Sequence, residues 1–318
     1  MKRAAIGFLI VGTALAAILI GRSEYGDILN AFRTLGVSGF LALVGVHLAL
    51  IVLMGVSWSV LGSPPRRAFV WARLVRDGAA EVLPLSQIGG FVLGARALVL
   101  AGAAPAFASA STVVDVTLEL VAQLFYTLLG LGLLAWLKPG SAIEGPAIAS
   151  VAAMAVLASL FVLAQRRGVG AVERVLTKLG GALLGPRPPG GASLRHSIAE
   201  IHRRPGRLVA GIALHLLAWV LVGGETWIIL SFIDAKLGLA EALVIDSLLS
   251  GLRSMAFMVP QALGVQEGAY VLLGALFGVP AEAALAMSLI RRARDLTIGA
   301  PALIAWQVIE GRRAYRAG

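Results

Sequence analysis

Four charged side chains lie near the middle of an apolar stretch close to the C-terminus, from Ala281 to Ile309. They are Arg291, Arg292, Arg294 and Asp295. The stretch has the length of one membrane-spanning helix, and a charge at the centre of a bilayer costs roughly 2.5–3.5 kcal/mol on insertion scales. Such groups usually face a polar cavity, and the planar guanidinium suits bidentate contact with phosphate. The pattern predicts a buried site for an anionic cargo such as a lipid headgroup.

Two acids in an earlier apolar stretch have matching spacing. Asp115 and Glu119 are four residues apart and so share one helix face, as do Arg291 and Asp295. We expect these acids to pair with arginines of the later stretch across the interior of a helical bundle. Because arginines outnumber acids in the later stretch, an unpaired arginine is expected to be left for an anion. The alternative is a network of ion pairs that only fixes packing.

A further polar group lies between residues 242 and 278. Asp246, Ser250 and Arg253 fall on one helical face, and Glu267 follows a Pro/Gly-containing break. Glu267 is expected either to cap the next helix, where a carboxylate complements free backbone N–H groups, or to gate the cavity. The predicted headgroup-binding residues are Arg291, Arg294, Arg292 and Arg253. The predicted gating or charge-pairing residues are Asp115, Glu119, Glu267, Asp295 and Asp246.

Other polar residues in apolar stretches carry weaker signals. Arg96 is expected either to extend to the inner membrane face or to line the cavity, and Glu225 has no partner nearby in sequence. His47 and His215 stand alone and are interpreted as structural. The four histidines show no metal-ligand spacing, and no catalytic motif stands out. We therefore expect no enzyme activity, no metal and no cofactor.

The composition indicates a polytopic membrane protein. Hydrophobic residues make up 58% of the chain and charged residues 14%, against about 45–50% and about 25% in soluble domains. Residues 1–318 are expected to form a single transmembrane domain. The net charge of +10 gathers beside apolar segments, which is the positive-inside pattern and not a nucleic-acid signature. Cysteine is absent, so thiol chemistry is excluded.

Six apolar segments have the length of full membrane spans. They are residues 4–20, 39–61, 111–137, 143–164, 208–232 and 281–309. The first is interpreted as a span and not as a cleaved signal peptide, because no Ala-x-Ala motif follows it. Arginine and lysine gather in the loop 62–78, the loop 165–206 and the C-terminal tail. We therefore predict a multi-pass protein of the bacterial inner membrane with both termini and the 165–206 loop in the cytoplasm.

Two more apolar stretches, 69–102 and 242–278, contain Pro and Gly near their centres. Each predicts two half-helices around a break, and paired interrupted segments are typical of a transporter's binding site. The two stretches are also 176 residues apart, as shown by Pro84 and Pro260 and by Gly102 and Gly278. The fold class expected is an all-α membrane protein of about six transmembrane helices and two re-entrant hairpins in an inverted repeat. Its halves would be about 1–137 and 143–318.

Short amphipathic helices are expected between the spans. The apolar residues of 23–35 recur at helical spacing, and the segments 172–184 and 194–202 of the inner loop show the same pattern. They are interpreted as interface packing, with the alternative of a basic surface that attracts anionic lipid.

The second break and the segment after it resemble a known family. Residues 263–269 read LGVQEGA, followed by Gly278-Val279-Pro280 and then Ser288-Leu289-Ile290-Arg291-Arg292. This resembles the lysylphosphatidylglycerol synthase transmembrane-region, or flippase-like, family. Leu83-Pro84, Ile88-Gly89-Gly90 and Val114-Asp115 resemble its earlier half, and a hopanoid-biosynthesis-associated branch is a closer match.

The resemblance implies inverted re-entrant hairpins and, in synthase-fused members, movement of a charged phospholipid between leaflets. The residues that match the family pattern are Glu267, Arg291, Asp115 and Glu119. One departure stands out. The family's P-G-G-x-G run is Pro260-Gln261-Ala262-Leu263-Gly264 here, so two glycines are replaced. The synthase's catalytic domain has no counterpart in this sequence, so synthesis is not implied.

Three functions remain open from the sequence. The preferred one is a lipid transporter for an anionic or amphiphilic lipid, a phospholipid or a hopanoid. The second is a non-catalytic membrane partner of a lipid-modifying or hopanoid-pathway enzyme, and the third a transferase for lipid-linked substrates. The expected partners are membrane lipids, with a lipid-modifying enzyme and a second copy of the chain left open, and no nucleic acid.

Overall fold

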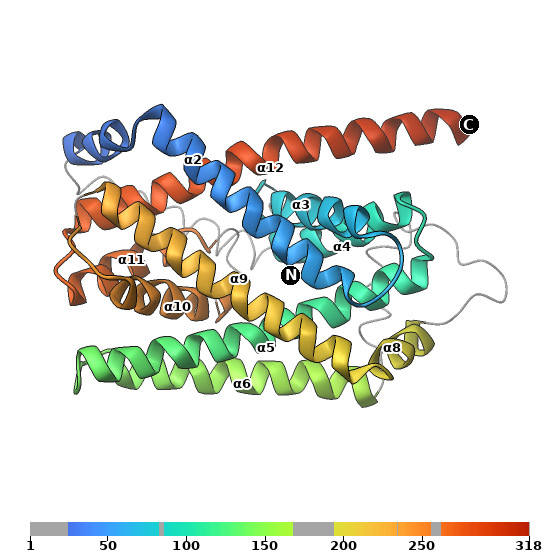
Figure 1. Ribbon diagram of the computed structural model, residues 1–318, viewed down its shortest axis with the longest axis horizontal. Helices are drawn as coiled ribbons and strands as arrows, with labels where there is room; N and C mark the ends of the chain where they lie inside the picture. Colours follow the sequence, from blue (N-terminus) through green and yellow to red (C-terminus); the bar gives the residue numbers. More distant parts are fainter. Residues whose placement is uncertain (1–24, 83–85, 168–193, 234, 256–261, 318) are drawn as a thin grey trace, which may run out of the picture. The chain divides into compact units, whose positions relative to one another are not determined.

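The chain folds into α-helices. The computed structural model describes residues 25–82, 86–167, 194–233, 235–255 and 262–317, and this part of the chain forms ten helices and no β-strand. The helices are α2 (Tyr25–Ser59), α3 (Arg66–Val82), α4 (Ser86–Leu100), α5 (Pro105–Leu137), α6 (Glu144–Arg167), α8 (Leu194–His202), α9 (Pro205–Phe232), α10 (Leu239–Met255), α11 (Val265–Leu276) and α12 (Ala281–Ala317) (Figure 1). The all-α prediction is confirmed.

Five of the six predicted spans coincide with long helices. They overlap with α2, α5, α6, α9 and α12, and the predicted span 4–20 lies outside the described residues. Three described segments, 33–59, 105–137 and 205–232, are long and apolar enough to cross a bilayer. The chain is therefore an all-α membrane protein.

Helix α2 contains a sharp bend at Gly36. This glycine has φ 61°, a left-handed conformation that a residue without Cβ adopts at little cost. The bend separates the segment from Tyr25 to Leu35 from the long apolar segment that follows it, as the blue ribbon in Figure 1 shows. The short helix predicted over 23–35 is thus present.

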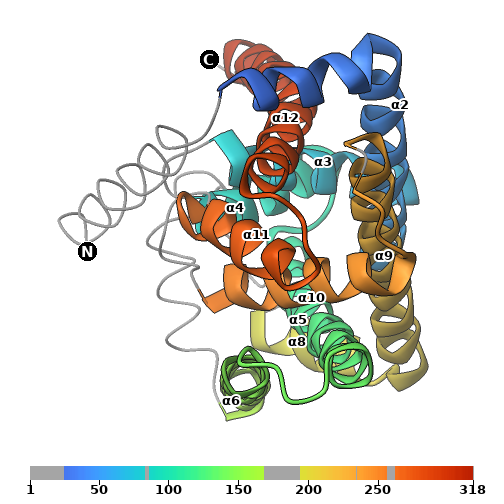
Figure 2. The same cartoon turned by 90° about the vertical axis from the view of Figure 1, so that its left-hand side faces the viewer.

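Both predicted hairpins are present. Within the described residues α3 runs to Val82 and α4 begins at Ser86. Helix α4 packs against α3, and α11 packs against α10 (Figure 2). Residues 83–85 and 256–261, which hold the first part of both predicted breaks (83–90 and 259–268), lie outside the described residues. The later part of each break is helical, because α4 begins at Ser86 and α11 at Val265.

The element bounds follow the predicted repeat of 176 residues. Helices α5 and α12 begin at residues 105 and 281, and α4 and α11 end at residues 100 and 276. The turns between these helices also match. Gly102 and Gly278 have φ 97° and 77°, and the next backbone N–H of each turn donates to a carbonyl five residues earlier, at 3.0 and 2.9 Å. This is the same glycine-terminated helix end in both halves.

The chain divides into two compact units that do not coincide with its halves. Unit 1 contains Met1–His47, Gln123–Val156 and Trp219–Asp295, and unit 2 contains Leu48–Ala122, Leu157–Ala218 and Leu296–Gly318. Each unit has one hairpin and its own apolar core. The core of unit 1 includes Leu134, Ile245, Tyr270 and Ile290, and that of unit 2 includes Trp58, Phe69, Leu98 and Val114.

Helix α8 packs its apolar side into the core of unit 2. Leu194, Ile198 and Ile201 are buried in that core. The predicted amphipathic segment 194–202 is therefore a helix, and its apolar face contacts protein. The other predicted segment, 172–184, lies outside the described residues.

Candidate functional sites in the two hairpins

A buried group of charges lies between α3 and α5 in unit 2. Arg76 donates from Nη1 to Asp115 at 2.8 Å and from Nη2 to Glu119 at 2.6 Å. Arg73 donates to Glu119 at 2.8 and 3.0 Å and to Asp77 at 2.7 Å. Both arginines are only 5% exposed, and Asp115 is fully buried. Buried charges in proteins are paired, and these pairs are charge-assisted hydrogen bonds.

Close packing of the hairpin positions Arg76. A Cβ built on Gly90 of α4 would lie 2.5 Å from the backbone oxygen of Arg76, and one on Gly94 would lie 3.0 Å from its Cβ. Glycines four residues apart thus allow α4 to approach α3 closely. The guanidinium also lies 4.7 Å from the ring centroid of Phe91, within cation–π range.

His215 of α9 completes the group in unit 2. Its Nε2 lies 3.0 Å from Oδ1 of Asp115, and its side chain is fully buried. An ionised carboxylate only accepts hydrogen bonds, so Nε2 is the donor in that state. The other ring nitrogen, Nδ1, is buried without a hydrogen-bond partner among the described residues.

In unit 1 the central ion pair joins Arg291 of α12 to Asp246 of α10. Nη1 of Arg291 lies 2.5 Å from Asp246 and donates also to the hydroxyls of Thr226 and Tyr270. Asp246 accepts two further hydrogen bonds, from Thr226 at 2.8 Å and from Tyr126 at 3.0 Å. Among the described residues, the hydrogen bonds of Arg291 all start from Nη1. Its Nε and Nη2 edge therefore carries none there.

A second pair group in unit 1 holds Arg294. Its Nη1 lies 2.6 Å from Glu225, and its Nε and Nη2 donate to Asp295 at 2.9 and 2.7 Å. His47 of α2 contacts the same acids, at 3.0 Å from Glu225 and 3.7 Å from Asp295. Arg294 is 2% exposed. Carboxylates thus lie beside both edges of this guanidinium, and the contact with Glu225 is an ion pair in which Nη1 forms no hydrogen bond with the described residues.

Glu267 caps α11 and also forms an ion pair. Its Oε2 accepts from the backbone N–H of Gly264 at 2.8 Å, and its Oε1 accepts from Ser288 and from Arg292 at 3.0 and 2.7 Å. The predicted capping role is confirmed, because the carboxylate satisfies a backbone donor at the helix N-terminus. The bond to Arg292 links this cap to α12.

The structure corrects two expectations about pairing. Asp115 and Glu119 pair with Arg76 and Arg73, not with arginines of the last span. Arg291, Arg292 and Arg294 each have a carboxylate partner, so the expected unpaired arginine is not found. The acids that pair with these three arginines come from α9, α10 and α11. Counting charges within the last span alone therefore does not predict whether an arginine is paired.

The remaining predicted residues lie in the hairpins or on the last helix. Arg253 lies on α10 and is half-buried. Arg96 pairs with Glu310 at 2.5 and 3.0 Å. Sequence reasoning missed Arg73 and Arg76 as site residues, because they were counted with the cytoplasmic loop. Arg73 and Asp77 are four residues apart on one helix face, and this spacing indicates an ion pair.

Metal ligation has no support in the described part of the chain. No group of three or more His, Asp or Glu side chains there is placed to hold an ion. The charged side chains described in both hairpins form hydrogen bonds and ion pairs.

A scan against protein-family models matched the description "Lysylphosphatidylglycerol synthase TM region" over residues 5–302. The match covers nearly the whole chain. The chain belongs to this family. Searches of curated proteins and of solved structures returned no match. Membership of the lysylphosphatidylglycerol synthase TM-region family makes this a membrane protein related to lipid.

The backbone is left-handed at one of the two positions where the glycine run is altered. Ala262 occupies a glycine position of the P-G-G-x-G run and has φ 47°, while Gly264 has φ 75°. Both values lie in the left-handed region, which costs a residue with Cβ roughly 1–2 kcal/mol. The turn therefore retains a conformation suited to glycine although alanine occupies it.

Proposed function

We propose that this protein moves an anionic or amphiphilic lipid, a phospholipid or a hopanoid, between the leaflets of the bacterial inner membrane. The protein would cross the membrane several times with both termini in the cytoplasm, and it would carry out no chemical step on the lipid. Family membership supports a role connected with membrane lipid.

One observation carries the proposal: each interrupted hairpin contributes to a buried group of arginine–carboxylate pairs. Such pairs cost desolvation energy, and apolar residues of similar volume often give equal or greater stability. Ionisable residues inside membrane segments usually mark a pathway or binding site. Broken helices in two halves of a chain are the setting in which transporters build such sites.

The contacts of Arg291 suggest how a headgroup would bind. Its Nε and Nη2 edge has no hydrogen bond with the described residues, and a guanidinium edge presents two parallel donors to a phosphate. If the phosphate drew Arg291 away from Asp246, the carboxylate would keep its bonds from Thr226 and Tyr126. Arg291 could thus exchange Asp246 for a phosphate while the carboxylate of Asp246 stays hydrogen-bonded.

A second candidate function has its own observation. The carboxylates of Glu225 and Asp295 lie beside the two edges of Arg294, which suits a charge network that only holds helices together. This favours a non-catalytic membrane partner of a lipid-modifying or hopanoid-pathway enzyme. In that case the cargo site would not exist, and the charges would matter only for folding.

Leaflet exchange in vesicles tests the proposal. The purified protein is reconstituted with fluorescent phosphatidylglycerol, and the lipid reaching the outer leaflet is quenched chemically. The test variant is Arg291→Gln with Asp246→Asn, which removes both charges and keeps polar groups at both positions. A hydrogen bond to a charged group contributes about 1.5–3 kcal/mol, so we expect exchange to slow by at least about tenfold.

The matched control is Arg96→Gln with Glu310→Gln, which removes another partly buried ion pair. It should exchange lipid at the wild-type rate. Wild-type exchange no faster than in empty vesicles, over a panel of anionic, zwitterionic and hopanoid lipids, would overturn the transport proposal. A neutral double variant that is as active as wild type would assign the pair a structural role and favour the second candidate.

A further inference from the structure

A cavity of about 570 Å³ that is open to the surface lies in unit 2, away from the buried pairs. Nine residues line it: Ser59, Val60, Gly62, Ser63, Arg66, Arg204, Gly206, Arg207 and Ala210. They come from the end of α2, the start of α3 and the junction of α8 and α9. Three of the nine are arginines, and none is acidic. The volume lies in the range of small-molecule sites.

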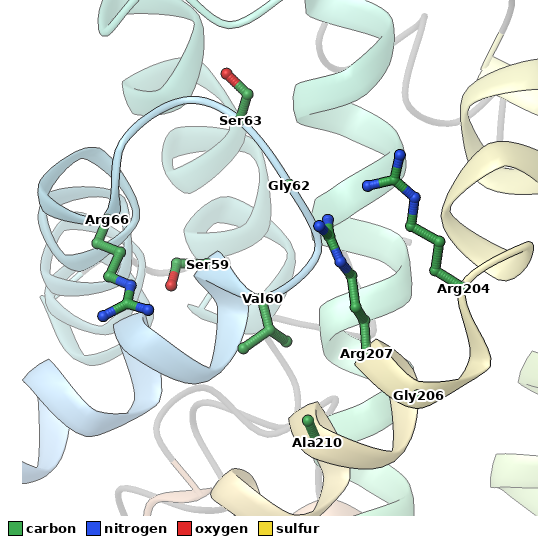
Figure 3. Close-up of a pocket in the computed structure, with 9 residues that line it drawn as sticks. All are labelled: Ser59, Val60, Gly62, Ser63, Arg66, Arg204, Gly206, Arg207 and Ala210. Carbon is green, nitrogen blue, oxygen red and sulfur yellow. The ribbon is translucent and has the colours of Figure 1, made fainter.

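The three arginines of this cavity are exposed to solvent. Among the described residues, Arg66, Arg204 and Arg207 form no ion pair, in contrast to the arginines of the hairpin groups. In Figure 3, Arg204 and Arg207 extend toward the turn at Gly62, and Arg66 extends toward Ser59. The cavity therefore concentrates uncompensated positive charge where a ligand can enter.

Two helix ends add to this charge. Helix α3 begins at Arg66 and α9 begins at Pro205, so the N-terminus of each contributes residues to the lining. Helix N-termini carry partial positive charge and free N–H groups, and they favour phosphate. Arginine supplies the bidentate donors that phosphate accepts.

We propose that this cavity binds a phosphate group, carried either by an anionic phospholipid or by a soluble phosphate compound. Under the predicted orientation these residues belong to cytoplasmic loops, so the lipid source would be the inner leaflet. The proposal does not depend on lipid translocation. Binding here is measurable in a protein that moves no lipid.

Lipid binding to the purified full-length chain tests the site. The protein is held in detergent micelles and titrated with phosphatidylglycerol, with phosphatidylcholine as the zwitterionic comparison, and bound lipid is counted by native mass spectrometry. The test variant is Arg204→Gln with Arg207→Gln. A basic residue near anionic lipid contributes about 1 kcal/mol, so two should change the affinity by about 30-fold.

The matched control is Arg67→Gln with Arg203→Gln. These exposed arginines are direct neighbours of lining residues but do not line the cavity. The control should bind phosphatidylglycerol with less than a threefold loss. An equal loss in both variants would overturn the proposal, because it would mean general surface attraction. Unchanged binding in the test variant would overturn it as well.

Two more measurements identify the source and guard against misfolding. Competition by glycerol phosphate or inorganic phosphate at millimolar concentration would assign the site to a soluble compound, and its absence would assign it to lipid. Arg66→Gln, on a different element, should weaken binding by about fivefold if the cavity is the site. Retained phosphatidylglycerol affinity in a folded Arg66→Gln variant would count against it.

Discussion

Replacing Arg76 by methionine should destabilise unit 2 strongly. The guanidinium is 5% exposed and donates to two buried carboxylates, Asp115 and Glu119. Breaking a buried pair by removing one partner costs about 3–5 kcal/mol. Here Glu119 keeps Arg73, and Asp115 keeps His215. We therefore expect the lower end of that range, a loss of about 3 kcal/mol.

Unfolding by denaturant in detergent, followed by tryptophan fluorescence, measures this loss. Trp58 is a suitable reporter because its ring lies 6.0 Å from the Arg76 guanidinium. The control is Arg67→Met on the same helix. Arg67 is exposed and makes no ion pair among the described residues, so its substitution should stay within about 0.5 kcal/mol of wild type.

A second substitution separates charge from packing. Asp115→Asn, added to Arg76→Met, removes one uncompensated carboxylate and keeps an acceptor for His215. The double variant should recover at least about 1 kcal/mol of the loss. If Arg76→Met alone lies within about 1 kcal/mol of wild type, or if the double variant is less stable than the single one, the reasoning about buried pairs is wrong.

Three other predictions concern the turn, the glycines and the topology. Ala262→Gly should raise the free energy of unfolding by about 1 kcal/mol in the same assay, because φ 47° is strained with a Cβ; no gain would contradict this. Gly299→Ala should lower the free energy of unfolding by about 1–3 kcal/mol, since the new Cβ would lie 2.8 Å from the backbone of α3. The control is Gly311→Ala on the same helix, where a Cβ meets nothing within 4 Å, so the free energy of unfolding should stay the same or rise. The chain has no cysteine, so Lys138→Cys and Arg312→Cys report topology directly. An impermeant maleimide should label the first from outside the cell and the second only after lysis, and labelling of both from one side would refute the predicted orientation.

The hairpins could be predicted from the sequence because their signals are local. Gly102 and Gly278 end helices because glycine adopts a positive φ at little cost. The 176-residue offset followed from the same positions. Apolar length predicted the spans, and the expected bounds 143–164 and 208–232 lie within a few residues of those of α6 and α9. Helices α2 and α12 are longer than expected, because α2 begins at Tyr25 and α12 runs to Ala317.

The pairing of charges could not be predicted, because it depends on which helices pack together. Asp246 and Arg291 are 45 residues apart, and no spacing rule connects them. Arg76 looked like part of a basic loop, yet α3 begins at Arg66, so Arg76 lies two to three turns into a buried helix. The packing of α3 against α4 and α5 buries Arg76, and a buried guanidinium needs a carboxylate partner.

The close fit at Gly90 restricts how the first hairpin can move. The backbone of Arg76 is pressed against α4 at this glycine, and its side chain is bonded to α5. A change of rotamer cannot release the charge without breaking two buried bonds, and a sliding of α4 along α3 would drive other side chains into the space that glycine leaves open. We therefore expect α3, α4 and the adjoining segment of α5 to move together as one rigid body. Arg76 would keep its hydrogen bonds to Asp115 and Glu119 during such a movement.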